Sequence, residues 1–343
     1  MLSKISHLRS VLLLTIPVLP FLASCQTSPA AAVEGEYSLS AQSVQINGII
    51  INMADWPGSS VSVAAVDDEA VTVTADSLLL GFDTLTIPAT AAGNGDSKYT
   101  FSGSYTGRDR DISLTGTVNK GVLSLSITDI CTSPVTGRWK AAVADDGLAD
   151  ISLSFYSPLV SDIPYGDGGS IPVEDALVLI NAALREAITP ELANLGYVEL
   201  TRTGYVGINW NGDISSEAEP LLQDVIQYWP EPEASRLHIY LRRTITDGMG
   251  LEISPLDAAL AYSTSEGSLM LSLDRKTISP WLGAISNTVN STTYEAYLEA
   301  GSPFGELSME EFTRYRSMAS LLVASLSMPD TELSLKVRMT PES

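Results

Sequence analysis

The chain has 343 residues, 45% of them hydrophobic, and a formal net charge of −22 at pH 7. It is longer than one hydrophobic core usually organises, so two domains are expected, and its apolar content excludes a disordered protein. So acidic a surface repels phosphate backbones and anionic lipid headgroups, which excludes nucleic acid as a partner.

Residues 1–24 have the parts of a bacterial lipoprotein export signal in the expected order. A basic start precedes an apolar run over 11–21, and small residues lead into Cys25. The run is about half of the roughly 20 apolar residues that a transmembrane helix needs, so a cleaved signal fits better than an anchor helix. We therefore expect acyl chains on Cys25, with a plain secretory signal cut near Ala23 as the alternative. Residues 25–33 are expected to form the lipidated tether.

The stretch 34–133 alternates apolar and polar residues with period two, and Gly, Asn, Asp or Pro separates the segments. This pattern is typical of an antiparallel meander. Because an open meander would leave unpaired edges, an all-β domain built as a barrel or a sandwich is expected. The predicted strands are 37–39, 44–46, 61–63, 71–73, 85–87, 99–101, 112–114 and 123–127.

From 134 to 343 helical spacing joins the strand pattern, which predicts an α+β domain. One helix is expected from Val173, with Pro172 in its first turn. Ser308 and Glu311 form a capping box at the start of another helix. The buried stripe of that helix is expected to be Met309, Phe312, Ala319, Leu322 and Leu326. The predicted strands are 137–140, 151–155, 198–202, 205–210, 237–243, 269–273 and 333–339.

Turn and strand phrases in both halves resemble those of lipoproteins from gut Bacteroidales that have an N-terminal calycin-like β-domain and a C-terminal α+β domain. The phrases are LTIP (85–88), YTFSG (99–103), LTGT (114–117), LSL (123–125), GYVEL (196–200) and GYVGINW (204–210). The resemblance implies a fold and an address in the cell envelope. It provides no functional residues, because the biochemical role of that family is unassigned.

The resemblance also implies attachment to the bacterial outer membrane through the acyl chains on Cys25. Surface-exported members of the group usually carry acidic residues directly after the anchoring cysteine, whereas residues 26–29 here are Gln, Thr, Ser and Pro. The periplasmic face of the outer membrane is therefore preferred to the cell surface.

Two short motifs match the pattern on which such bacteria O-glycosylate exported proteins, namely Asp, then Ser or Thr, then an aliphatic residue. They would place a glycan on Ser77 and on Thr84. A Ser- and Thr-rich chain gives about one or two matches by chance, so coincidence stays open for both.

Motifs for catalysis and metal binding are missing from the sequence. His238 is the only imidazole left once His7 leaves with the signal, which excludes zinc sites that need two histidines. The acidic clusters, including 109–111, lack the spacing of a calcium loop, and 109–111 is interpreted as a solvated hairpin edge. Cys131 has no local base and is expected to be buried near the domain junction. We therefore expect no metal, no cofactor and no enzyme.

Candidate ligand-binding residues lie on one predicted strand. Arg236, His238, Tyr240 and Arg242 alternate with apolar residues, so they share one face. This basic, aromatic face is a candidate site for an anionic ligand, and the alternative is a solvated strand face with a cross-strand histidine.

Two tryptophans are further candidates because each precedes a proline in a predicted loop. Trp56 and Trp229 are expected to be exposed there, where an indole ring can stack on a sugar or on an apolar ligand. The alternative is a ring that packs over a domain edge.

Two functions from different classes remain. The first is a non-catalytic cell-envelope lipoprotein that binds a small apolar or glycan ligand, or a partner protein. The second is a glycan hydrolase that uses carboxylates alone, since a pair of acidic residues is enough for that reaction. A carboxylate pair of this kind cannot be recognised among 41 acidic residues without a structure.

Overall fold

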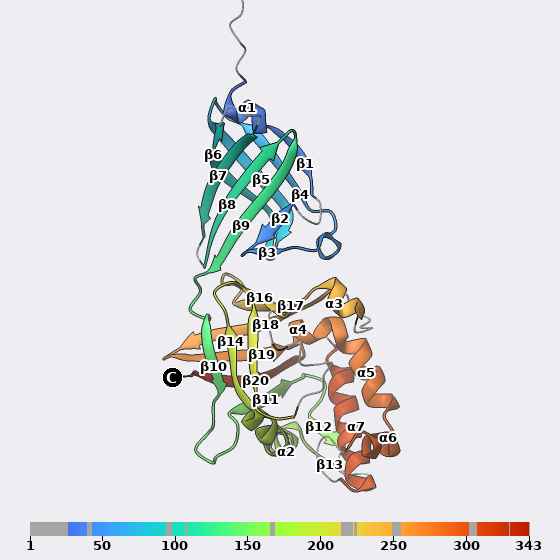
Figure 1. Ribbon diagram of the computed structural model, residues 1–343. Helices are drawn as coiled ribbons and strands as arrows, with labels where there is room; N and C mark the ends of the chain where they lie inside the picture. The colour runs from blue at the N-terminus through green and yellow to red at the C-terminus, as the bar shows by residue number, and fades with distance from the viewer. Residues whose placement is uncertain are drawn as a thin grey trace, which may run out of the picture.

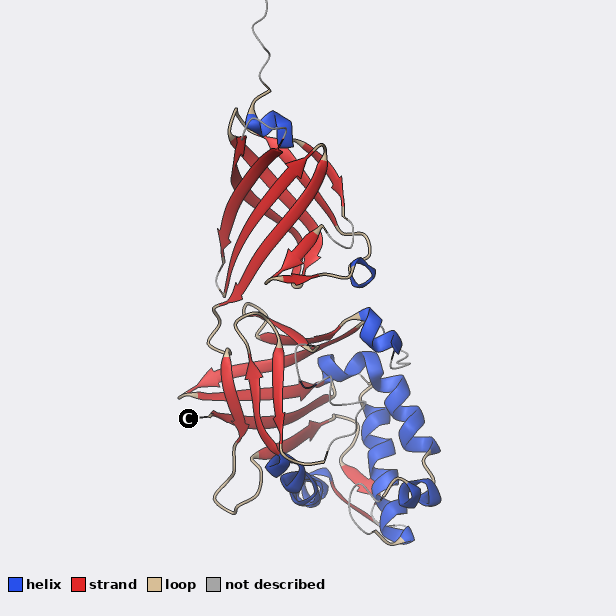
Figure 2. Ribbon diagram, viewed as in Figure 1, coloured by secondary structure: helices blue, strands red, loops and turns tan. Residues whose placement is uncertain are grey.

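The computed structural model describes residues 27–39, 43–93, 98–107, 109–164, 169–213, 222, 225–248, 255–301, 307–328 and 330–342. The predicted signal and Cys25 lie outside these ranges. Two curled sheets follow each other along the chain, and Figures 1 and 2 show them one above the other. Within the described part of the chain, no helix is long and apolar enough to cross a membrane.

The N-terminal half is a nine-stranded sheet that curls into a near-closed barrel (Figure 1). Strands β4 to β9 form the predicted antiparallel meander. β1 pairs with β4 at one end of the strand order. The chain then passes to the other end of the order, where β2 pairs in parallel with β9. The elements are α1 (Pro29–Val33), β1 (Gly35–Ser38), β2 (Val44–Ile46), β3 (Ile49–Ile50), η1 (Met53–Asp55), β4 (Ser60–Ala65), β5 (Ala70–Leu79), β6 (Phe82–Gly93), β7 (Lys98–Thr106), β8 (Arg110–Asn119) and β9 (Val122–Cys131).

The barrel interior is filled by its own side chains. Every second residue of the long strands is buried, as the period-two pattern predicts, and these residues form one continuous core. The largest fully buried side chains include Phe101, Leu78, Ile87, Ile112 and Ile127. The inside of the barrel is therefore a packed core.

The short helix α1 packs against the barrel, at the end far from the C-terminal half (Figure 1). Ala30 and Val33 are fully buried there, and the hydroxyl of Tyr37 donates to the carbonyl of Val33 at 2.6 Å. Residues 29–33, expected in the tether, thus belong to the barrel.

Phe101 depends on a glycine opposite it on the neighbouring strand. Gly116 is its direct cross-strand partner, and a Cβ atom at Gly116 would lie 2.0 Å from the Phe101 ring. The ring therefore covers the glycine backbone, in the space that any other side chain would need.

Gly116→Ala should destabilise the barrel by about 1–3 kcal/mol, because the added methyl group forces the Phe101 ring out of its position. Gly207→Ala is the matched control, since its Cβ would meet only an ordinary contact of 3.6 Å. Denaturant unfolding of both variants measures the difference. Equal midpoints for the two variants would contradict this packing.

The C-terminal half is a second curled sheet with helices on one side (Figure 2). Its strand order runs β15-β14-β10-β20-β19-β18-β17-β16, and β11 pairs with β20. The two ends of this order meet, because Tyr205 bridges to Gln227 just before β15. The strands are β10 (Gly137–Ala141), β11 (Ile151–Tyr156), β12 (Asp162–Pro164), β13 (Ser170–Pro172), β14 (Leu195–Leu200), β15 (Val206–Trp210), β16 (Gln227–Glu231), β17 (Arg236–Leu241), β18 (Leu256–Ser265), β19 (Ser268–Asp274) and β20 (Glu332–Pro341).

The helices form a second layer of packing beside this sheet. Phe155, Val173, Met318 and Leu322 belong to a core that joins α2 and α7 to the neighbouring strands. The helical elements are α2 (Val173–Asn194), α3 (Arg243–Gly248), α4 (Arg275–Ile278), η3 (Ser279–Trp281), α5 (Leu282–Ser291), α6 (Tyr294–Glu299) and α7 (Met309–Ser325).

The predicted capping box is confirmed, because Ser308 and Glu311 make both of its hydrogen bonds before α7. α2 begins at Val173, as predicted, but Pro172 is its N-cap and the last residue of β13 rather than a residue of the first turn. The buried stripe of α7 is wrong at Met309, which is 64% exposed because it is the first helical residue after the cap. Met318 is buried in its place.

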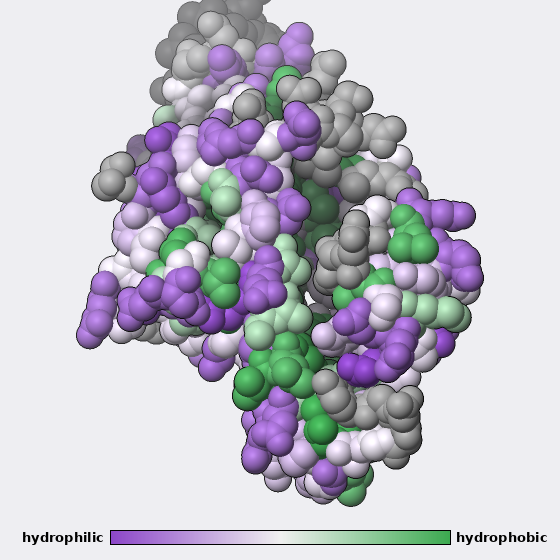
Figure 3. All heavy atoms as spheres, turned by 90° about the horizontal axis from the view of Figure 1, so that it is seen from below, coloured by the Kyte–Doolittle hydropathy of each residue, from purple (hydrophilic) through white to green (hydrophobic). Residues whose placement is uncertain are grey.

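One face of α2 is apolar and exposed. Val178 and Leu179 are 68% and 42% exposed, and Figure 3 shows apolar side chains gathered on the face of the molecule where α2 lies. α2 therefore carries apolar residues well beyond the stripe that it buries.

Candidate functional site

Arg110 organises the end of the barrel that faces the C-terminal half. Its guanidinium pairs with Asp129 on β9, with 3.0 Å between Nε and Oδ1, and donates to the carbonyl of Leu80 in the β5–β6 turn. It also lies 4.8 Å from the centre of the Phe82 ring. The Arg110 and Asp129 side chains are only 12% and 13% exposed, so the solvated edge expected at 109–111 is wrong for Arg110.

Asn47 connects this end of the barrel to the C-terminal half. Its side-chain amide donates to the carbonyl of Asp129 at 3.0 Å and to the carbonyl of Thr203 at 3.2 Å. The backbone of Asn47 has a φ of 51°, a left-handed conformation that asparagine tolerates better than most residues. One side chain thus satisfies a carbonyl in each half.

Asp55 provides a second connection. The carboxylate accepts hydrogen bonds from the Thr244 backbone N–H at 2.8 Å and from the Thr244 hydroxyl at 3.0 Å. Thr244 lies in the first turn of α3, whose N–H groups have no partner inside the helix. A buried carboxylate of the barrel region therefore caps a helix of the other half.

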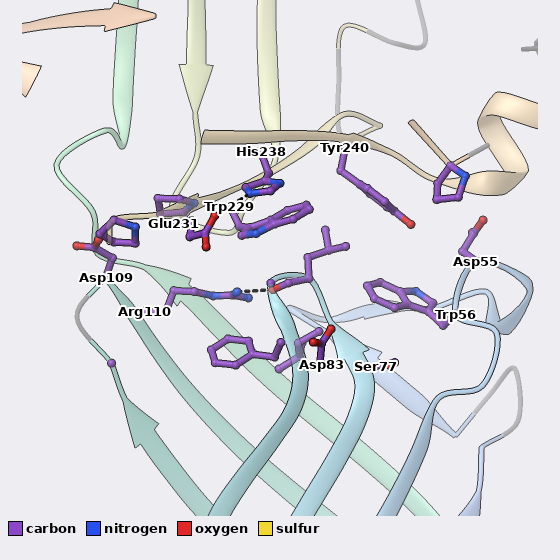
Figure 4. Close-up of a pocket in the computed structure, with 18 of the residues that line it drawn as sticks. Asp55, Trp56, Ser77, Asp83, Asp109, Arg110, Trp229, Glu231, His238 and Tyr240 are labelled. Carbon is purple, nitrogen blue, oxygen red and sulfur yellow. Dashed lines mark hydrogen bonds and ion pairs between the residues drawn. The ribbon is translucent and has the colours of Figure 1, made fainter. Parts of the chain in front are cut away.

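A cleft of about 790 Å³, open to solvent, lies between the two halves (Figure 4). The barrel contributes the residues after η1 and the β5–β6 and β7–β8 turns, while the C-terminal half contributes the β16–β17 hairpin and the start of α3. Its aromatic lining consists of Trp56, Phe82, Tyr105, Trp229, His238 and Tyr240.

Trp229 forms the centre of the aromatic wall. It is the direct cross-strand partner of His238, and the two rings stack with centroids 4.3 Å apart and an interplanar angle of 12°. Tyr240 meets the indole at 6.0 Å. The indole also lies against Gly81, which has a φ of +78°, and a Cβ there would be 2.6 Å from Trp229 Cδ1. Trp229 is thus held between the hairpin and a barrel turn.

His238 is placed between two carboxylates. Its Nδ1 lies 2.9 Å from Asp257 Oδ1, and its Nε2 lies 3.4 Å from Glu231 Oε2. Burial of the ring acts to lower the pKa of His238, but the hydrogen bonds and charges of Asp257 and Glu231 outweigh it and raise that pKa above its ordinary value. The raised pKa extends the pH range in which the ring is protonated, and the protonated ring is attracted to the face of the Trp229 indole.

Four of the candidate residues named from the sequence line the cleft, namely Trp56, Trp229, His238 and Tyr240. The expected exposure of the two tryptophans is wrong, because both are half-buried. Trp56 packs against the barrel core, and Trp229 lies on strand β16 rather than in a loop. Pro230 is tolerated in β16 because, among the described residues, the edge of the strand away from β17 is paired only near its start, at Gln227 and Tyr228.

The two arginines of the predicted strand face lie elsewhere. Arg236 pairs with Asp274, with 2.6 Å between Nη2 and Oδ2. Arg242 lines a smaller cavity of about 40 Å³ beside the cleft, and its buried Nε has no hydrogen-bond partner among the described residues. Neither guanidinium is part of the cleft lining, so the predicted anion site is not assembled there.

The two candidate glycosylation sites are both exposed. Ser77 lies at the rim of the cleft, with a φ of 47° beside a register shift in β5. The Thr84 hydroxyl donates to Asp76 at 2.8 Å.

Residues that the sequence interpretation missed complete the lining. Arg110 lines the cleft, and so do four acidic residues, namely Asp83, Asp109, Glu231 and Glu233. Arg110 could have been found by continuing the β8–β9 hairpin register, which places its side chain beside Asp129. The acidic residues lie in turns, where the sequence gives no spatial signal.

The described residues also show how the metal-ligating side chains and Cys131 are placed. No group of three His, Cys, Asp or Glu residues in the described part of the chain could hold a metal ion. Cys131 is buried, as expected, and burial raises the pKa of its thiol. It therefore behaves as a small apolar residue of the second core.

Comparisons with known proteins give no match. No family model matches the chain, and no match to it was found among the curated proteins or the solved structures. The cleft is therefore interpreted from its own residues.

The stability that His238 contributes should depend on pH. Because the folded-state pKa is raised above 6.5, this contribution is fully present below pH 6.5 and is lost as the pH rises through the folded-state pKa. The unfolding free energy of wild type should thus exceed that of His238→Gln by more at about pH 5.5 than at about pH 8.5. The double variant Asp257→Asn/Glu231→Gln is the control, in which His238→Gln should give no such pH dependence. An equal difference at both pH values in the wild-type background would contradict this account.

Proposed function

We propose that this protein is a non-catalytic lipoprotein of the bacterial cell envelope that binds a saccharide between its two halves. The observation that carries the proposal is the cleft, where indole rings from both halves accompany several carboxylates. Trp56 comes from the barrel region and Trp229 from the β16–β17 hairpin (Figure 4). Its volume of about 790 Å³ falls in the range of small-ligand sites.

The combination of groups suits a sugar. The apolar face of a pyranose ring stacks on an indole, and its hydroxyl groups donate to carboxylate oxygens, which are acceptors only. The carboxylates of Asp83, Asp109 and Glu233 offer such acceptors at the cleft. A purely apolar ligand would leave these groups without partners, which disfavours it. A partner protein that inserts a side chain into the cleft is the remaining option.

Preorganisation supports binding at the Trp229 wall. The indole is fixed by the His238 ring on one side and by Gly81 in the barrel turn. A ligand that stacks there does not have to order a mobile side chain, which lowers the entropic cost of binding.

The proposed fold is a calycin-like barrel followed by an α+β domain. The near-closed sheet and the helices beside the second sheet support it. Barrels of about eight strands either hold one small ligand inside or are filled by side chains. Here the interior is occupied by side chains such as Phe101 and Ile87, so we place the ligand at the barrel end, in the cleft.

The proposed location is the periplasmic face of the outer membrane, with acyl chains on Cys25. It rests on the order of basic, apolar and small residues before Cys25, and on the absence of acidic residues directly after it.

Replacing Cys25 by Ser should abolish lipid attachment and release the protein from the membrane fraction, because no thiol remains at this position to be acylated. Metabolic labelling with a fatty-acid precursor measures the attachment, and Cys131→Ser is the control that should keep it. Incorporation of the label into Cys25→Ser, or none into wild type, would contradict the lipoprotein assignment.

A carboxylate-based glycan hydrolase is the second candidate. The observation in its favour is that Asp83 from the barrel and Glu231 from the hairpin both line the cleft, since glycosidases use a pair of acidic residues on either side of the bond. In this case a bound oligosaccharide would be cleaved, and Asp83→Asn would stop the cleavage.

Trp229→Ala should weaken saccharide binding by tenfold or more, since stacking of one aromatic ring contributes about 0.5–1.5 kcal/mol beyond the area that it buries. Trp56→Ala should also weaken binding, because it removes the opposite aromatic group. Tyr156→Ala is the control, as this exposed aromatic residue lies outside the cleft. Titration calorimetry with glycan oligomers measures the affinities. Loss of binding in Tyr156→Ala, or none in Trp229→Ala, would place the ligand elsewhere.

A further inference from the structure

We infer that the saccharide of this cleft is cationic and carries free amino groups on its sugar rings. The inference rests on the proposed saccharide binding and adds the charge of the ligand. Some charged side chains of the cleft have a partner within the protein and others have none, and the charge of those without a partner sets the charge of the ligand.

The cleft is lined by carboxylates that the protein itself does not neutralise. Asp55 is occupied by Thr244, and Glu231 faces His238. The carboxylates of Asp83, Asp109 and Glu233 form no hydrogen bond or ion pair with another side chain or backbone group of the described residues. Three carboxylate groups are therefore available as acceptors to a ligand.

The cations of the cleft are largely neutralised within the protein. Arg110 is held by Asp129, by the Leu80 carbonyl and by the Phe82 ring. His238 lies between Asp257 and Glu231. Arg243 is exposed at the cleft and makes no ion pair with a described residue. Among the described residues of the cleft, three carboxylates without an ion pair therefore outnumber the one guanidinium without an ion pair, and the net charge that faces a ligand is negative.

An ammonium group suits both features of this lining. It donates up to three hydrogen bonds to carboxylates, and it is attracted to the face of an indole such as Trp56 or Trp229. The net charge of −22 for the chain raises the local concentration of cations and repels uronic or sulfated sugars. An amino sugar carries its ammonium group next to a ring face that can stack. One sugar residue of the ligand can therefore contact a carboxylate and an indole ring of the cleft at the same time.

The test compares three trisaccharides that differ in charge. The mature chain is titrated by calorimetry at about pH 6, where amines of this kind are protonated, with the trimer of glucosamine, the trimer of N-acetylglucosamine and a trimer of galacturonic acid. The glucosamine trimer should bind at least tenfold more tightly than the acetylated trimer. Added salt should reduce the difference, because the carboxylates are at or near the surface.

Variants locate the effect. Asp83→Asn/Glu233→Gln should lower the affinity for the glucosamine trimer by a larger factor than the affinity for the acetylated trimer, so that the preference for the glucosamine trimer falls towards one. Glu174→Gln/Asp175→Asn, at the start of α2 and outside the cleft lining, is the matched control and should change neither affinity.

The possible failures are distinct. If the acetylated trimer or the galacturonic acid trimer bound as tightly as the glucosamine trimer, or more tightly, the inference of a cationic ligand would be wrong. The proposal of saccharide binding would still hold. Binding of oligolysine with none of the three trisaccharides would overturn both, and would indicate a basic peptide as the ligand. An unchanged preference in Asp83→Asn/Glu233→Gln would also overturn the inference.

Discussion

The shielded ion pair between Arg110 and Asp129 fixes the end of the barrel on which the rest of the site depends. Removing one partner of a buried pair costs about 3–5 kcal/mol, because the other charge is left without compensation. Here the pair also positions its neighbours. Arg110 holds the β5–β6 turn through the Leu80 carbonyl, while the backbone of Asp129 exchanges hydrogen bonds with Asn47, which reaches the C-terminal half. The pair thus serves both the shape of the barrel end and the attachment of the other half.

A series of side-chain contacts leads from the β5–β6 turn into the cleft. Gly81 leaves room for the indole of Trp229, the indole stacks on His238, and the imidazole is held by Asp257 and Glu231. Each contact in this series joins a different segment of the chain. On the opposite side, Asp55 fixes the start of α3, so the two halves are joined on both sides of the cleft.

The strands and helix starts were predictable because they depend on local signals. The period-two alternation over β5 to β9 and the cap at Ser308 are examples. The parallel pairing of β2 with β9 was not, since no local pattern encodes which strand closes a barrel. β18 was missed because its alanines and leucines have no strand preference until the neighbouring strands cover them. The cleft could not be predicted for a similar reason, because Trp56 and Trp229 are 173 positions apart and line the same cleft only through the packing of the two halves.

The central claim is that both halves contribute to one binding site. Hydrogen exchange of backbone amides with and without the glucosamine trimer tests it most directly, because exchange slows where a ligand orders or covers the chain. The account predicts slower exchange in the turns at 53–59 and 79–82 of the barrel region together with 227–240 of the β16–β17 hairpin. Protection confined to one half, or protection at the strands far from the cleft, would contradict it.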